Sequence, residues 1–178
     1  HMLDTQALGG IDAATLTTLQ NQGQVTAAWA DSGSWEVLDI GIHPYSYDIE
    51  GYRQVSGDRP AIFGDQSTRQ AIAMCLNRQA LVQSLSLSPS AVMNTYLPSS
   101  HPLYYPAAPV YGYDFNAASS LLVQAGWSAY SGGPLQAISV AEVYGNVPFE
   151  VSYYHLNDAY STLVAQTLAQ SLDTCGIH

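Results

Sequence analysis

Residues 65–85, DQSTRQAIAMCLNRQALVQSL, decide the fold. The stretch predicts two short helices meeting at a polar joint, because apolar residues recur on one face of each half with a helical period. That inward face carries Ala71, Ile72, Cys75 and Leu76 in the first helix, and Ala80, Leu81, Ser84 and Leu85 in the second. A short side-chain oxygen can accept from the free N–H groups of a first turn, so Asp65 or Ser67 is expected to cap the first helix and Asn77 the second.

The composition excludes several classes of partner. Fourteen acids stand against four arginines and no lysine, and the net charge of −10 opposes binding to nucleic acid or anionic lipid. No run of eighteen apolar residues is present, so no membrane-spanning segment is predicted. We interpret residues 1–2 as a cloning remnant and expect 3–178 to form a single domain.

The rest of the chain predicts further helices and strands. One helix is expected over residues 11–22, with Asp12 as its cap and Gly23 as its stop. Another is expected from its cap at Asp114 or Asn116 to its stop at Gly126. Alternating residues predict strands at 24–30, 35–42 and 149–155. Residues 43–63 form a long irregular insert. A last helix begins after Asn157 or Asp158 and stops at Gly176, and its predicted inward stripe is Tyr160, Leu163, Val164, Thr167, Leu168, Ser171 and Leu172.

Two cysteines and two arginines invite structural interpretations. Cys75 and Cys175 are expected on the inner faces of their helices, either as two small buried side chains or as one disulfide, and the sequence leaves both open. Arg69 and Arg78 are expected to serve structure rather than ligand binding, with acids such as Asp65 or Asp114 as partners.

Catalytic and metal sites find little support in the residues. His43, His101 and His155 lie on separate loops or strand ends, where a histidine is usually solvated or hydrogen-bonded. No Gly-x-Ser-x-Gly elbow and no glycine-rich phosphate loop occur. The glutamates that could pair for glycoside hydrolysis include Glu36 and Glu150, whose alternating positions favour a solvent-facing role. We therefore predict no catalytic residue, no metal site and no cofactor.

Ligand contacts are predicted at Tyr96, Tyr154, His155 and Asn157. The last three come where a predicted strand turns into a helix, the place where open α/β sheets tend to bind ligands. Tyr96 begins a tyrosine-rich passage that ends at Tyr113. Core packing remains the alternative for these rings, and it is favoured for Tyr104, Tyr105, Tyr111 and Tyr113, which lie among prolines.

The chain resembles the family 5 extracellular solute-binding proteins, which include the oligopeptide, dipeptide and nickel receptors of ABC importers. One motif matches through Asp65, Arg69, Gln70, Ala71, Ile72, Asn77, Arg78, Leu81 and Val82, with Asn77 where the family usually has Asp. A second matches through Tyr111, Tyr113, Asp114, Ala118, Leu121, Leu122, Ala125, Gly126 and Trp127.

The resemblance implies an α/β fold: one lobe of a periplasmic-binding-protein type II-like fold, with a mixed sheet flanked by helices. The chain would then be most of the ligand-closing lobe of a longer protein, with no enzymatic activity. Its implied partners are a small solute, expected to be a peptide, and an ABC permease. Its implied location is extracellular, periplasmic or on the cell surface as a membrane-anchored lipoprotein. The family's next strand and its amine-binding Asp would follow His178, so we expect weak peptide binding and self-association by the chain alone. The alternatives are a solute-sensing lobe of a regulatory protein and a hydrolase fragment.

Overall fold

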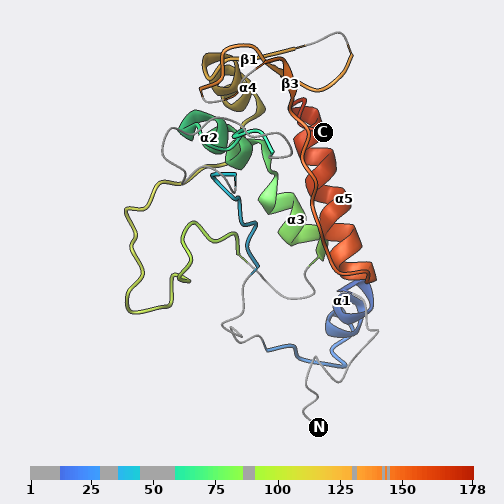
Figure 1. Ribbon diagram of the computed structural model, residues 1–178. Coiled ribbons are helices and arrows are strands. Elements are labelled where there is room, and N and C mark those ends of the chain that lie inside the picture. Colours follow the sequence, from blue (N-terminus) through green and yellow to red (C-terminus); the bar gives the residue numbers. More distant parts are fainter. Residues whose placement is uncertain are drawn as a thin grey trace.

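The computed structural model describes residues 13–28, 36–44, 59–85, 91–129, 132–141, 143 and 145–178. The helices are α1 (Ala13–Asn21), α2 (Gln66–Cys75), α3 (Arg78–Leu85), α4 (Phe115–Gln124) and α5 (Ala159–Thr174). The strands are β1 (Trp127–Ser128), β2 (Gln136–Ala137) and β3 (Val147–Pro148), paired antiparallel in the order β1-β2-β3. Helix α2 packs on α4, β1 lies against α4, and α5 contacts both α2 and α3 (Figure 1).

Helices α2 to α5 begin at the predicted caps. In each, a side-chain oxygen accepts a hydrogen bond from an N–H group of the first turn. The pairs are Asp65 with Thr68 (2.6 Å), Asn77 with Ala80 (3.1 Å), Asp114 with Ala117 (3.0 Å) and Asp158 with Ser161 (2.8 Å). Gly126 and Gly176 follow α4 and α5 with φ of 98° and 75°, which confirms both as left-handed stops.

The core forms where the small sheet meets α2 and α4. The rings of Trp127 and Phe149 stack with centroids 4.0 Å apart, and both side chains are fully buried. The indole N–H of Trp127 donates to the hydroxyl of Thr68 on α2 at 3.0 Å. Thr68 is completely buried, so this bond satisfies two polar groups that water cannot reach.

A disulfide joins the C-terminal ends of α2 and α5. Cys75 and Cys175 are bonded with their Cα atoms 6.2 Å apart, and both residues are buried. The hydroxyl of Ser171 strengthens this junction, because it donates to the carbonyl of Cys75 (2.8 Å) and accepts from the N–H of Asn77 (2.9 Å). Helix α5 is thereby fixed to the joint between α2 and α3.

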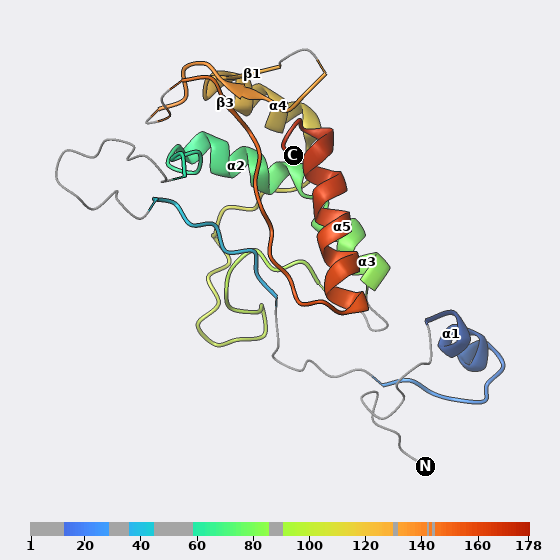
Figure 2. The same ribbon diagram turned by 45° about the vertical axis from the view of Figure 1, so that its right-hand side comes forward.

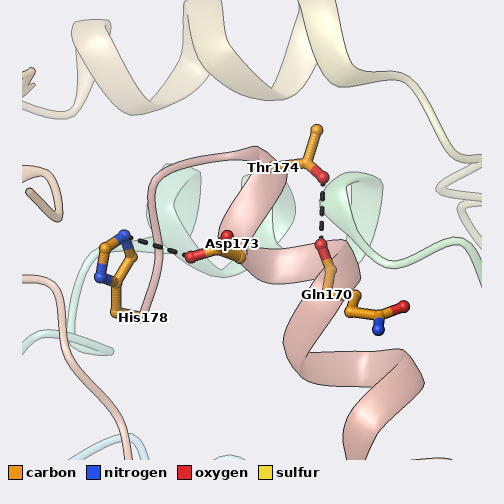
Figure 3. Close-up of polar contacts among 4 residues, drawn as sticks. All are labelled: Gln170, Asp173, Thr174 and His178. Atoms are coloured by element: carbon orange, nitrogen blue, oxygen red, sulfur yellow. Dashed lines mark hydrogen bonds and ion pairs between the residues drawn. The ribbon is translucent and has the colours of Figure 1, made fainter. Parts of the chain in front are cut away.

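The last residues of the chain add a parallel pairing to the antiparallel sheet. The N–H of His178 donates to the carbonyl of Phe149 (3.0 Å), and the N–H of Val151 donates to the carbonyl of His178 (2.8 Å). This bond pattern is the one found between parallel strands, and it ties residues 149–151 to His178 on the far side of α5. The His178 ring turns back to Asp173, with Nε2 and Oδ1 3.2 Å apart, near the Thr174–Gln170 hydrogen bond (Figure 3). The fold is the mixed α/β lobe that was expected.

The three long predicted strands are wrong. Residues 24–28 and 36–42, the described parts of the first two, form no strand, and neither do residues 149–155, which follow β3. The alternating side chains of Val25, Val37 and Ile42 are not buried in the core, since all three are at least 41% exposed. Apolar alternation makes a strand only where a neighbouring backbone supplies hydrogen bonds. Among the described residues of these three stretches, only Phe149 and Val151 bond a backbone that is distant in sequence: both bond His178, and the N–H of Phe149 also donates to the carbonyl of Leu135.

The predicted helix faces are partly right. Ala71, Ile72, Cys75 and Leu76 are all buried as expected. Ala80 is exposed, and the side chains of residues 84 and 85 lie outside the described part. On α5, Val164 is buried, but Tyr160 (47%) and Leu163 (45%) are exposed because the first turns of that helix run past the end of the core.

The N-terminal region is less closely packed. Helix α1 stands away from the other helices in Figure 2, and its predicted cap Asp12 lies outside the described residues, as do residues 1–2. Most of the predicted insert, residues 45–58, also lies outside them. Its two ends are joined by Arg59, whose guanidinium donates to the carbonyls of Gly41 and of His43, the latter at 2.8 Å.

Candidate functional site

A groove of about 530 Å³ opens beside the joint between α2 and α3. Two irregular stretches line it, residues 91, 92 and 94 and residues 110–113, and we call them its two walls; Leu76, Arg78 and Gln79 complete the described lining. We call it the Arg78 groove. Both walls belong to the segment 91–113, which loops away from the helices as the yellow-green trace of Figure 1.

Arg78 holds the two walls together. Its guanidinium donates to the carbonyl of Met93 at 3.1 Å and to the carbonyl of Tyr111. Because one carbonyl comes from each wall, the guanidinium links the two walls. The second wall is also tied to α2, since Gln70 Nε2 donates to the Tyr111 hydroxyl (3.1 Å) and the N–H of Asp114 donates to the carbonyl of Met74 (3.0 Å).

The structural role expected for the arginines holds, but their predicted acid partners are wrong. Arg69 donates to the carbonyls of Phe63 (2.7 Å) and Gly64 (2.6 Å), just before α2, and Arg78 bonds the two carbonyls described above. The physical reason is that irregular backbone leaves carbonyls without a ladder partner, and a guanidinium can serve two of them at once. Asp65 and Asp114 are instead used as helix caps.

The described residues of the groove lining are neutral apart from Arg78. They offer the amides of Gln79 and Asn94, the phenols of Tyr111 and Tyr113, and apolar side chains such as Val110. Val110 is 64% exposed and Tyr113 is 48% exposed. An apolar and aromatic lining with a few polar groups is typical of small-ligand sites.

The residues predicted to contact ligand lie outside this lining. Tyr96 is 73% exposed on the segment 91–113, and Tyr154, 91% exposed, lies with His155 and Asn157 on the exposed connection into α5. The ring of His155 stacks with the ring of Tyr153, with their centroids 6.1 Å apart. No hydrogen bond or ring contact among the described residues joins Tyr96 to the other three, and their role in binding stays a prediction.

Two titratable groups near the start of α5 are perturbed. Hydrogen bonds from the N–H and hydroxyl of Ser161 lower the pKa of the Asp158 carboxyl, since they favour its ionised form. Partial burial raises the pKa of Tyr160, and the nearby Glu36 carboxylate raises it further. In the parts of the chain that the structure describes, no three His, Cys, Asp or Glu side chains gather as a metal site would require.

The sequence signature described as bacterial extracellular solute-binding proteins, family 5 Middle, matches residues 6–178. The chain belongs to this family. None of the curated proteins gives a significant match. Within the described residues, no helix of this family 5 chain has the length and apolar character needed to cross a bilayer.

Solved structures similar to this family 5 chain include two peptide complexes. The oligopeptide binding protein from Thermus thermophilus, complexed with a pentapeptide, is 32% identical with a TM-score of 0.54, over 64% of this chain and 19% of that one. The oligopeptide-binding protein AppA from Bacillus subtilis, in complex with a nonapeptide, is 20% identical with a TM-score of 0.53, over 66% of this chain and 23% of that one. The alignments thus cover about a fifth of each relative's length, and AppA supports the fold alone.

Sequence reasoning did not find the groove. Tyr111 and Tyr113 were expected mainly to pack in the core, and Val92, Asn94 and Gly112 carried no signal. The one usable signal was Arg78, a cation at the start of a predicted helix with two irregular segments downstream. Its carbonyl partners have no sequence pattern that would reveal them.

Proposed function

We propose that this chain is one lobe of a receptor that binds peptides outside the cytoplasm and delivers them to an ABC importer. In this proposal the lobe has no catalytic role and closes over the solute together with a second lobe. Binding then stabilises the closed form because the solute contacts both lobes only in that form. The permease recognises the closed receptor, and the protein resides in the periplasm or at the cell surface.

The observation that carries the proposal is the family match together with the Thermus thermophilus relative. The match spans residues 6–178, and the relative shares 32% identity over 64% of this chain and is complexed with a pentapeptide. The structure adds a groove whose neutral amides and phenols suit the polar backbone of a peptide.

The class of solute can be tested on the chain itself by nuclear magnetic resonance. The ¹⁵N-labelled chain is titrated with tri-alanine to tens of millimolar, and maltotriose serves as the control solute. We expect saturable amide shifts with tri-alanine and none with maltotriose. One lobe lacks the second wall of a closed cleft, so the expected Kd is about millimolar.

Either of two results would contradict the proposal. The first is the absence of saturable shifts with tri-alanine in a chain that circular dichroism shows to be folded. The second is an equal response to maltotriose, which would indicate a different class of solute.

A further inference from the structure

The Arg78 groove holds a positive charge that no acid among the described residues of its lining offsets. Of those described residues, Arg78 alone is charged. Asp114 follows Tyr113 directly, but its carboxylate accepts from the N–H of Ala117 at the start of α4. In the described part of the chain, the guanidinium of Arg78 forms no ion pair with a carboxylate.

The guanidinium of Arg78 also has more N–H donors than its two hydrogen bonds use. It has five N–H groups, and its two hydrogen bonds to the carbonyls of Met93 and Tyr111 leave others open. Both partners are neutral carbonyls, so they do not cancel the charge. A ligand carboxylate would supply the missing counter-charge and bond geometry.

The wall beside this charge is open to a peptide backbone at Gly112. Apart from its chain neighbours, no heavy atom of the described residues lies within 4 Å of the place where a Cβ of Gly112 would stand, and the φ of Gly112 is outside the left-handed region. Among the described residues, the backbone N–H groups of Gly112 and Tyr113 donate to no protein acceptor. They can therefore receive the carbonyl groups of a ligand that approaches closely.

We propose that the Arg78 groove binds the C-terminal carboxylate of a short peptide, with the residues before it lying along Gly112 and Tyr113. This inference rests on the proposed peptide-binding function and deepens it by assigning one end of the ligand to one charged group. The volume of about 530 Å³ lies within the roughly 300–1,000 Å³ of small-ligand sites. The structural role of Arg78 as the link between the walls is retained.

The ligand side is tested with the unaltered chain and three peptides: tri-alanine, its N-acetyl form and its C-terminal amide. Titrations are run at 0.15 M salt, where the Debye length is about 8 Å and the distant acids are largely screened. We expect tri-alanine and N-acetyl-tri-alanine to bind alike and the amide to bind about tenfold or more weakly. Equal binding of the amide would overturn the assignment of the carboxylate.

The protein side is tested with Gly112→Val and the matched control Gly133→Val. Both glycines have open space around the Cβ position and a φ outside the left-handed region, but only Gly112 lines the groove. We expect Gly112→Val to weaken tri-alanine binding at least about fivefold and Gly133→Val to leave it unchanged, with circular dichroism spectra like those of the parent chain.

The outcomes separate this inference from the proposed function. If the parent chain binds tri-alanine and the two variants bind alike, the groove is not the site, but the peptide-binding function stands. If the parent chain binds no peptide, both fail. If Gly112→Val does not fold, the comparison of acid with amide still decides whether a carboxylate is recognised.

Discussion

Removing the Cys75–Cys175 disulfide should lower the stability of the chain by several kcal/mol. The two residues are 100 apart in sequence, so the bond closes a long loop in the unfolded chain. In the chain-entropy treatment, a loop of that length gains about 15.8 cal/mol/K when opened, or about 4.7 kcal/mol at 25 °C. Measured values for native disulfides are about 2–5 kcal/mol, and we expect the upper half of that range.

The double variant Cys75→Ala, Cys175→Ala is compared with the parent chain by guanidinium unfolding, followed by far-ultraviolet circular dichroism. The reduced parent chain provides a second comparison, because it opens the same loop without removing the sulfur atoms. Both cysteines are buried, so reduction should require prior unfolding and be slow under native conditions. A loss below about 1 kcal/mol in both comparisons would refute the loop-closure reasoning and point to residual structure in the unfolded state.

Substitutions at three further sites, and one set of measurements on the unaltered chain, have expected outcomes. Thr68→Val should cost about 1–3 kcal/mol of unfolding free energy in urea, because the buried indole N–H of Trp127 loses its acceptor. Thr68→Ser keeps a hydroxyl acceptor and should retain most of the parent chain's unfolding free energy. Leu168→Ala should cost about 2 kcal/mol, the low end for a core leucine, since Leu168 is only partly buried against the core; a shift under about 1 kcal/mol would contradict that contact. The pKa of Asp158 is lowered by folding, so its contribution is present above the ordinary carboxyl pKa and is lost as the pH falls through the folded value; the difference in melting temperature between the parent and Asp158→Asn should therefore shrink in acid. Calorimetry should find no micromolar peptide binding by the chain alone, and light scattering should show self-association; micromolar binding by a clean monomer would contradict this expectation.

The helices could be predicted because their signals are local. Asp65, Asn77, Asp114 and Asp158 each cap a helix within three residues of themselves, and an apolar stripe follows each cap. The strands could not be predicted, because each is two residues long and depends on a partner elsewhere in the chain. The residues at which the buried face of α5 begins and ends could not be predicted either, since the sequence does not show where the core ends along a helix.

The candidate site could not be predicted either, because it too depends on contacts between residues far apart in sequence. Its walls are brought together by an arginine that bonds backbone carbonyls 15 and 33 residues away, and any residue can offer a carbonyl. Tyr154, His155 and Asn157 follow a rule about strand ends, but residues 152–155 extend beyond the point where the chain pairs with His178. Residues 152–155 therefore lie at no sheet edge, and the rule that ligands bind at strand ends does not apply to them.

One bonding pattern is shared by Arg59, Arg69 and Arg78, and it limits which substitutions the chain can tolerate. Each guanidinium joins at least two backbone carbonyls. Lysine has the same charge, but its compact ammonium lacks the planar fork that spans two separated acceptors. Exchange of arginine for lysine is ordinarily treated as conservative, yet at these three positions it would release irregular backbone that no strand pairing holds. A lysine-free sequence is consistent with that constraint, and descendants of this chain should keep arginine at these positions even while their surface charge drifts.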